Sequence, residues 1–400
     1  MMNKIETHRF TAIMGTAVLL LVPSFDIVLK YTGLPGIAAY FIAGLTGLYI
    51  CDHFVVQLFI SRVTDRQSVI AAMVVFLVLI LIVAVGYPIA NSGRFGGGSD
   101  IDDAMVVGAS ALLRGEYPYY HLTYLGGMLS PMPGTILLSV SFVFFGQIQY
   151  QNIFWLAILF VASRKILGDS VLSLGIIGTV VLISPTFYQV LVTGSDHIAN
   201  SIYIIVGLWL TVRAVTTPGS STLQKLLPAI LLGIGLSSRS NFLLILPLFF
   251  SVLVQNSSWK DAIKYVSVAL LVFAAVTLPF YVYDSGGFTP LIVQRAKITE
   301  LEALLPHAGV IIPLSALLLS IGLAMNKMDR DCAVFFRNCA IVQLFTLLFT
   351  STLYAIQSGH FTLFLGTGGY GMFTLFFAVV SVWITFHNVT LSIRSSSGPR

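Results

Sequence analysis

Three aspartates, Asp100, Asp102 and Asp103, lie within four residues of one another in a chain that has only 16 acidic residues. One carboxylate at such a place can take a proton from a hydroxyl group as a general base, while a neighbour holds the hydroxyl-bearing molecule or a divalent cation. The three glycines at 96–98 make the backbone beside them flexible, which suits close approach of a substrate. Asp100 and Asp103 are predicted to share a helix face that Asp102 does not share. We therefore take Asp103 and Asp100 as candidate catalytic residues and Asp102 as a candidate substrate ligand.

The same aspartates also fit a purely structural role. Residues 102–113 are predicted to form a short helix that Gly115 ends. Asp100 can be the N-cap of this helix, with the other acidic groups near the positive end of its dipole. Catalysis and capping both remain open on the sequence alone.

Basic side chains are available to hold an anionic substrate group. Arg239 lies at a break between two short apolar segments, so we expect it at a helix end near the outer membrane surface. Its guanidinium group suits a phosphate, and anchoring in lipid headgroups is the alternative. Arg295 and Lys297, in another outer loop, are the second candidates for holding a phosphate.

A tight turn and an aromatic group supply further candidates. Asp196 and His197 follow Gly194 and can orient a donor phosphate or an acceptor, although Asp196 can equally cap the next helix. Tyr119 belongs to a group of tyrosines that fit interfacial anchors, with sugar binding by stacking as the alternative. No histidine has a partner at the spacing of a zinc site, so we predict no zinc centre, while a divalent cation held by the aspartates stays open.

The elements that position these residues are membrane helices. Hydrophobic residues make up 57% of the chain and charged residues 9%, with a mean hydropathy of +0.93. Soluble chains of this length do not have such a composition. The net charge of +5 fits lysines and arginines that fix orientation in a membrane, which argues against a nucleic-acid partner. Apolar segments lie at 10–30, 36–58, 69–89, 150–164, 170–191, 199–215, 226–239, 242–255, 264–283, 307–325, 338–356 and 368–389.

A shorter apolar segment, residues 133–147, decides the predicted topology. Its length and the prolines at its start suit a helix along the membrane surface better than a spanning helix. With that segment outside the membrane, most of the 21 lysines and arginines fall on the cytoplasmic side. The prediction is an all-α polytopic protein of the inner (plasma) membrane with about twelve transmembrane helices, cytoplasmic termini, and juxtamembrane helices in the first large outer loop.

The chain divides around this outer loop. Residues 1–89 are predicted to hold the first three transmembrane helices, residues 90–149 the outer loop with its aspartates and juxtamembrane helices, and residues 150–400 the remaining transmembrane helices. The candidate residues fall in segments expected to face the periplasm or the exterior. These segments are 90–132, 193–200, 284–305 and 358–369.

An ordered set of motifs resembles one enzyme family. The set comprises the aspartate cluster, Ala-Leu-Leu-Arg-Gly-Glu-Tyr-Pro-Tyr (111–119), Ser-Pro-Met-Pro-Gly (130–134), Arg-Lys (164–165), Thr-Gly-Ser-Asp-His (193–197) and Gly-Ile-Gly-Leu-Ser-Ser-Arg (233–239). Over roughly residues 90–255 the chain resembles the GT-C glycosyltransferases, polytopic enzymes that transfer a sugar from a polyprenyl-phosphate carrier. The resemblance implies that an aspartate of the first outer loop is the catalytic base, and Asp103 or Asp100 matches its place. Two additional spans before that loop, and the lack of a large soluble C-terminal domain, depart from the family pattern and leave the donor sugar and acceptor open.

The favoured function is an inverting transfer of a sugar from a polyprenyl-phosphate donor to a cell-envelope lipid or polysaccharide acceptor outside the cytoplasmic membrane. An O-antigen-type polysaccharide polymerase or ligase, with a diphosphate-linked donor held by outer arginines, is the first alternative. A secondary transporter is the second, and it would need charged residues in the middle of the membrane. The spans after residue 132 contain almost no acidic residues, which argues against a transporter.

Overall fold

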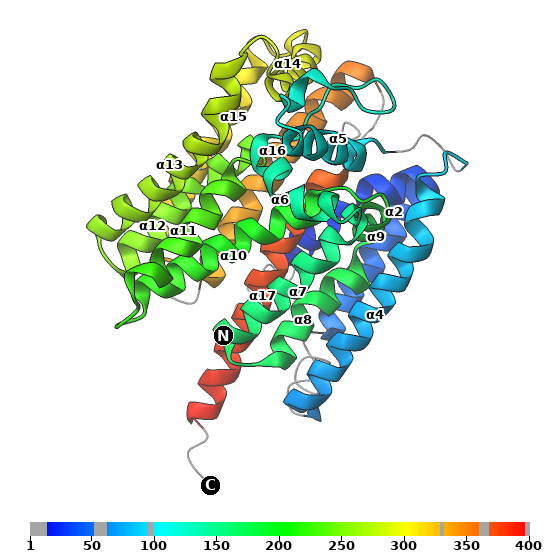
Figure 1. Ribbon diagram of the computed structural model, residues 1–400. Coiled ribbons are helices and arrows are strands. Elements are labelled where there is room, and N and C mark those ends of the chain that lie inside the picture. The colour runs from blue at the N-terminus through cyan, green and yellow to red at the C-terminus, as the bar shows by residue number, and fades with distance from the viewer. Residues whose placement is uncertain (1–13, 52–61, 95–98, 329–331, 360–367, 397–400) are drawn as a thin grey trace.

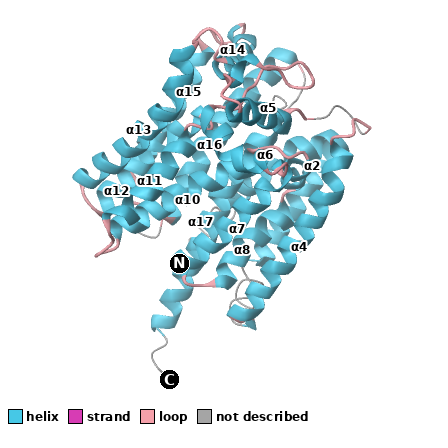
Figure 2. Ribbon diagram, viewed as in Figure 1, coloured by secondary structure: helices cyan, strands magenta, loops and turns pink. Residues whose placement is uncertain are grey.

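The computed structural model describes residues 14–51, 62–94, 99–328, 332–359 and 368–396, and these residues form helices joined by loops. They include no strand, and an isolated β-bridge pairs Leu122 with Met128. Figures 1 and 2 show a bundle of helices with shorter helices across one end, where α5 and α14 lie. The predicted all-α class is confirmed. We call this end of the bundle the α5 end.

Most helices run along the bundle. They are α2 (Phe25–Ile50), α4 (Asp65–Ala90), α7 (Gln151–Leu167), α8 (Ser170–Ile183), α10 (His197–Thr216), α11 (Thr222–Leu236), α12 (Leu246–Asn256), α13 (Trp259–Tyr283), α15 (Ala308–Ala324), α16 (Ala333–Ser358) and α17 (Gly371–Ser396). The shorter elements are α5 (Ile101–Leu113), α6 (Pro133–Phe144), α9 (Pro185–Val192) and α14 (Thr289–Glu302), with the 3-10 turns η1 (Val22–Ser24), η3 (Pro118–Tyr120), η4 (Ile148–Tyr150), η5 (Ser240–Ile245) and η6 (Gly368–Tyr370).

The protein has several helices that can cross a membrane. Among the described residues, six helices are long and apolar enough, and the number is eight if each of two bent pairs forms one span. The predicted count of about twelve is therefore not confirmed. In the first bent pair, α6 makes an angle of 119° with the helical stretch Ile148–Leu167, so α6 is not a continuation of α7.

One predicted segment differs from the structure, and one predicted division agrees with it. Residues 170–191 form two helices bent by 90°, because Pro185 begins a new helix and the Ser184 hydroxyl accepts a hydrogen bond from the Phe187 N–H. The predicted division between the segments 10–30 and 36–58 agrees with the structure where both are described, because α2 consists of two helical parts that meet at the non-helical residue Gly33 (φ +70°).

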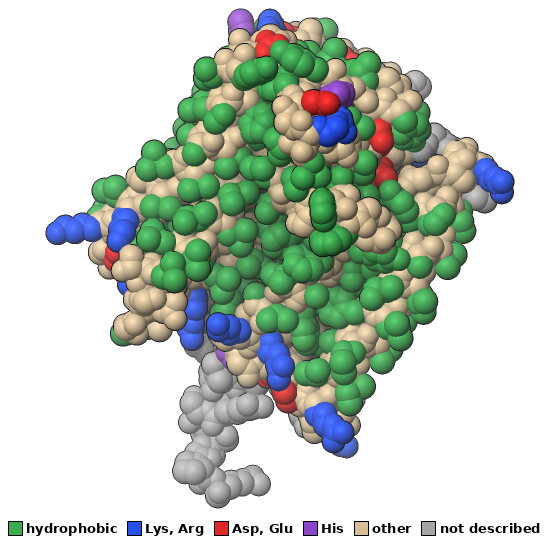
Figure 3. All heavy atoms as spheres, in the orientation of Figure 1, with side chains coloured by type: hydrophobic (Ala, Val, Ile, Leu, Met, Phe, Trp, Pro, Cys, Tyr) green, Lys and Arg blue, Asp and Glu red, His purple; other side chains and the backbone are tan. Residues whose placement is uncertain are grey.

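Basic residues gather at the end of the bundle opposite α5. Figure 3 shows most Lys and Arg side chains of this face along its lower edge. Arg164 at the end of α7 donates to Asp65 at the start of α4, with Nη2 and Oδ2 2.9 Å apart, and Ser170 at the start of α8 also bonds to Asp65. These three helix ends therefore lie at the same end of the molecule.

Helix α10 occupies the interior of the bundle. It is the most enclosed of the described helices that can span a membrane. In its apolar stretch of 18 residues 83% of the residues are buried, compared with 17% in the corresponding stretches of α4 and α13. The residues at the start of α10 are consequently surrounded by protein.

Gly134 allows the start of α6 to approach the end of α11. Its N–H donates to the Ser237 carbonyl at 3.0 Å, and a Cβ at this position would stand 2.2 Å from the Ile234 carbonyl oxygen. Because backbone atoms cannot move aside as side chains do, we expect Gly134→Ala to lower the free energy of unfolding by about 1–3 kcal/mol. Thermal unfolding in detergent measures the effect. Gly178→Ala is the control, because its Cβ would meet nothing within 4 Å, and equal transitions for the two variants would contradict the prediction.

Candidate functional site

A buried ion pair joins the start of α10 to the segment between α11 and η5. Arg239 Nη2 donates to both carboxylate oxygens of Asp196, at 2.7 and 2.8 Å. Asp196 is completely buried and Arg239 is 8% exposed. The prediction that Arg239 occupies a break between helices is confirmed. Anchoring of Arg239 in lipid headgroups is wrong, because protein encloses its side chain.

Two further side chains complete the surroundings of the Asp196 carboxylate. Asn200 Nδ2 donates to Oδ2 at 2.8 Å, and the Thr135 hydroxyl lies 3.5 Å from the same oxygen. Asp196 stands at the N-cap position of α10, as the capping alternative predicted, but its side chain makes no capping hydrogen bond to the N–H groups of that helix. Neither partner was predicted from the sequence. The contact with Asn200 could have been expected, because Asn200 lies one helical turn after Asp196. The contact with Thr135 could not, because Thr135 belongs to α6, far away in the sequence.

The ion pair fixes the charges of both partners. Burial raises the pKa of Asp196, but the positive charge of Arg239 outweighs burial, so the pKa lies below its ordinary value. Burial lowers the pKa of Arg239, and the Asp196 carboxylate outweighs that effect, so the pKa lies above its ordinary value. Both groups are therefore charged at neutral pH, and the pair carries no net charge.

His197 lies beside this pair at the first position of α10. Its Nδ1 is 2.5 Å from the Ser195 hydroxyl, and its ring contacts Tyr370 edge-on with the ring centroids 4.8 Å apart. A Cβ at Gly369 would stand 2.8 Å from His197 Nδ1, so glycine allows the backbone there to lie against the imidazole. The position holds His197 within the protein, with 3% of its surface exposed.

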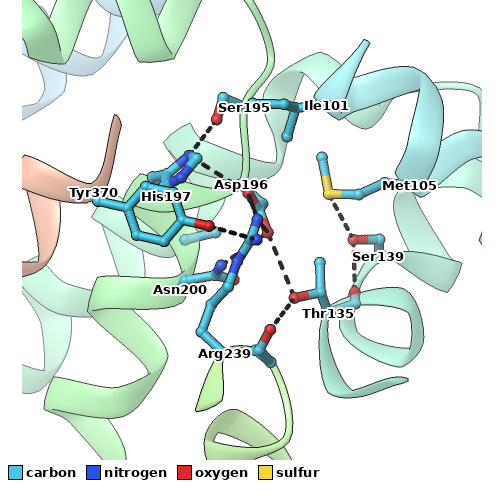
Figure 4. A network of polar contacts seen from close by, with 12 residues as sticks. Ile101, Met105, Thr135, Ser139, Ser195, Asp196, His197, Asn200, Arg239 and Tyr370 are labelled. Atoms are coloured by element: carbon cyan, nitrogen blue, oxygen red, sulfur yellow. Dashed lines mark hydrogen bonds and ion pairs between the residues drawn. The ribbon is translucent and has the colours of Figure 1, made fainter. Parts of the chain in front are cut away.

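Two buried nitrogens at this place have no hydrogen-bond partner within the described part of the chain, which leaves out 360–367. They are Nε of Arg239 and Nε2 of His197. Tyr370 lies against both side chains, since its hydroxyl is 3.4 Å from Arg239 Nη1 and its ring contacts the His197 ring (Figure 4). Buried polar atoms are nearly always hydrogen-bonded, so unpaired donors indicate a place where a ligand with hydrogen-bond acceptor atoms can bind.

Helix α5 lies across this end of the bundle and carries Asp102 and Asp103, and Asp100 stands directly before it. It begins at Ile101 and ends at Leu113, and Gly115 follows with φ +73°, as predicted. The Asp102 Cβ would be 3.1 Å from a Cβ at Gly194, so Asp102 lies against the turn that leads to Asp196. Its Oδ2 accepts from the Tyr87 hydroxyl at 2.6 Å and from Asn91 Nδ2 at 3.3 Å.

Asp100 and Asp103 bind a different part of the chain from Asp102, which confirms the predicted division between two faces. The Thr123 hydroxyl donates to Asp100 Oδ2 at 2.8 Å, and the Tyr124 N–H donates to Asp103 Oδ2 at 2.7 Å. Both aspartates are partly exposed. Asp100 stands at the N-cap position but makes no capping hydrogen bond to the helix.

The remaining candidates do not join the Asp196 pair. The Tyr119 hydroxyl donates to the Pro131 carbonyl at 3.1 Å, and its ring packs edge-on against Phe288, which leaves 3% of the residue exposed. Arg295 and Lys297 are exposed on α14.

Among the described residues, no group of three or more histidine, cysteine, aspartate or glutamate side chains could hold a metal ion. The three aspartates of α5 do not converge, because Asp102 faces α4 while Asp100 and Asp103 face residues 123–124. The glycines at 96–98 lie outside the described residues. The chain matches no protein-family model, no curated protein and no solved structure.

Proposed function

We propose that the protein is a membrane glycosyltransferase that transfers a sugar from a polyprenyl-phosphate-linked donor to a lipid or glycan acceptor. One observation carries the proposal: Arg239 Nε and His197 Nε2 are buried and unpaired at the end of the bundle where α5 carries its carboxylates. A donor phosphate needs hydrogen-bond donors, and an acceptor hydroxyl needs a base. The resemblance of residues 90–255 to GT-C enzymes supports the same function.

The nitrogens near Tyr370 are suited to a phosphate. The Asp196 carboxylate holds the Nη2 side of the Arg239 guanidinium, which leaves Nε as the unused donor. When His197 Nδ1 accepts the Ser195 hydroxyl proton, Nε2 carries the ring hydrogen and is the second unused donor. Binding of the phosphate here requires the Tyr370 side chain, which lies against both groups, to move or to share the site.

The carboxylates beside α5 are suited to taking a proton from the hydroxyl group of the molecule that receives the sugar. Asp103 is partly exposed, and the Tyr124 N–H fixes one of its oxygens. In the proposed reaction Asp103 takes the proton of the acceptor hydroxyl, and the hydroxyl oxygen forms a bond to the anomeric carbon. The bond from that carbon to the phosphate oxygen breaks at the same time, and its electron pair leaves with the lipid phosphate. Attack from the opposite face inverts the configuration of the sugar.

The proposal places the α5 end outside the cytoplasmic membrane. The basic residues at the other end of the bundle support this orientation, since lysine and arginine are enriched on the cytoplasmic side. We also propose that the chain crosses the membrane about twelve times. That count treats the bent pairs as single spans, divides Met14–Ile50 at the Gly33 kink, and includes the shorter apolar helices. These are Thr222–Leu236, Ser240–Asn256 and Ala308–Ala324.

The test is sugar transfer by the purified protein. The protein in detergent is incubated with radiolabelled polyprenyl-phosphate sugars, with polyprenyl-diphosphate sugars, and with a lipid extract of the cell envelope as the acceptor. Transfer from a monophosphate donor is the expected result. Transfer from the diphosphate donors alone would overturn the proposal in favour of a polymerase or ligase, and proton- or sodium-coupled uptake into proteoliposomes without transfer would overturn it in favour of a transporter.

A further inference from the structure

The contact between the end of α4 and the start of α5 contains two acceptor oxygens that lack donors. Asn91 Nδ2 donates to Asp102 Oδ2, and the Tyr87 hydroxyl donates to the same oxygen. The other oxygen of each group, Oδ1 of Asp102 and Oδ1 of Asn91, is buried and has no hydrogen-bond partner among the residues that the structure describes, which leave out 95–98. Asp102 and Asn91 are therefore joined by one hydrogen bond, and each has a second side-chain oxygen that accepts none.

Leaving both oxygens unpaired is costly. A buried acceptor without a donor has lost its hydrogen bonds to water and gained none in return, and the loss is greater for a charged group. Asp102 itself is 6% exposed, so water at the surface does not hydrate its carboxylate fully. A carboxyl group and a primary amide can form two antiparallel hydrogen bonds with each other, provided that the carboxyl group is protonated, because its O–H then faces the amide oxygen.

We propose that Asp102 is protonated and donates this proton to Asn91, so that Tyr87, Asn91 and Asp102 form a neutral polar lock between α4 and α5. The lock positions α5, and with it the carboxylates of Asp100 and Asp103, over the turn at Gly194. Asp102 is thus a positioning residue, and the inference does not depend on the proposed glycosyl transfer.

A proton fits this place better than a metal ion. Magnesium and calcium ions take six or more oxygen ligands and usually keep several water molecules. The two unpaired oxygens are closed off from solvent, and the described residues provide no group of three acidic, histidine or cysteine side chains around them. A proton needs no additional ligands and removes the charge of the buried carboxylate.

The pKa of Asp102 lies above its ordinary value, which favours the protonated form. Burial is the largest cause and raises the pKa, as does the negative charge of Asp103, whereas the hydrogen bond from Tyr87 and the backbone N–H groups of Asp102 and Asp103 lower it. Helix α4 contributes Tyr87 as the titratable group facing Asp102, and α5 contributes Asp103. The turn at Gly194 packs against the Asp102 Cβ, and its nearest acidic group, Asp196, is neutralised by Arg239.

The pH dependence follows from the raised pKa. The stabilisation from a protonated Asp102 is fully present below the ordinary value of 3.8 and is lost as the pH rises through the raised pKa of the folded protein. We expect the melting temperature of the wild type to fall over that window. Asp102→Asn should not show this fall, because its amide supplies an N–H donor in place of the carboxyl proton at every pH.

Infrared difference spectroscopy tests the protonation directly. In wild-type protein at neutral pH, we expect the carbonyl band of a protonated carboxyl group, shifted in heavy water, absent in Asp102→Asn and retained in the matched control Asp100→Asn. Asp102→Leu should melt lower than Asp102→Asn, because the Tyr87 hydroxyl and the Asn91 amide then lose their acceptor. Absence of the Asp102 band from the wild type would overturn the proposal. A rise in wild-type melting temperature on addition of magnesium or calcium, absent in Asp102→Asn, would overturn it in favour of a metal site.

Discussion

Replacing Asp196 by alanine is expected to lower the free energy of unfolding by about 3–5 kcal/mol, because the substitution leaves the guanidinium of Arg239 buried without a counter-charge. The carboxylate accepts both hydrogen bonds from Arg239 Nη2 and another from Asn200, and it is completely buried. Removing it therefore removes several charge-assisted contacts in a place that water does not reach. Unfolding in detergent, followed by tryptophan fluorescence, measures the loss.

A double substitution separates the charge effect from the loss of packing. In Asp196→Leu combined with Arg239→Met, both charges are gone and apolar side chains fill most of the space, so the stability is expected to return close to that of the wild type. Arg239→Met alone should destabilise the protein, because it leaves the Asp196 carboxylate buried and unpaired. If the double variant were as unstable as Asp196→Ala, the buried charge would not be the cause of the loss.

Asp103→Asn is expected to lower the rate of sugar transfer by about 10²–10⁴-fold, the contribution of a general base. Asparagine keeps a side-chain oxygen that can accept the hydrogen bond from the Tyr124 N–H, so the segment after residue 121 should retain its position. What asparagine cannot do is take a proton at neutral pH. The transfer rate at saturating donor and acceptor is the measurement, with the melting temperature recorded for each variant.

The control for Asp103→Asn is Glu302→Gln, which neutralises an exposed acidic group on α14 at the same end of the molecule. It should leave the transfer rate unchanged. Asp100→Asn tests the other candidate base, because Asp100 also accepts one hydrogen bond from the loop, in its case from the Thr123 hydroxyl. Loss of activity in Asp100→Asn alone would move the base to Asp100. Full activity in both aspartate variants would mean that neither carboxylate is the base, and that both only form hydrogen bonds to the loop that contains Thr123 and Tyr124.

Local patterns predicted several features of the site correctly. Helix α5 and its end at Gly115 followed from an apolar stretch between an aspartate and a glycine. The division of the aspartates between two faces followed from helical periodicity, and the position of Arg239 in a break followed from the short apolar segments on either side. Each of these features depends on residues that are neighbours in the sequence.

The partners of the charged residues could not be predicted in the same way. Arg239 and Asp196 are 43 positions apart, and nothing in either segment indicates that the side chains meet. Thr135 reaches Asp196 because α6 turns back over the bundle, and Tyr370 reaches Arg239 because η6 lies beside the start of α10. The Asp196 side chain makes no capping hydrogen bond for this reason: an ion pair with a distant arginine outweighs a local bond to its own helix.

The sequence by itself determined that this protein is helical and apolar enough to contain several membrane-crossing helices, because hydrocarbon leaves backbone amides no partners except one another. It also determined which short segments carry the charged residues. Only the tertiary structure decided that α10 is enclosed, that Asp196 and Arg239 neutralise each other, and that the face carrying Asp102 lies against α4. These outcomes depend on contacts between segments far apart in the chain, and the energy of a buried charge is set by the groups that surround it in space.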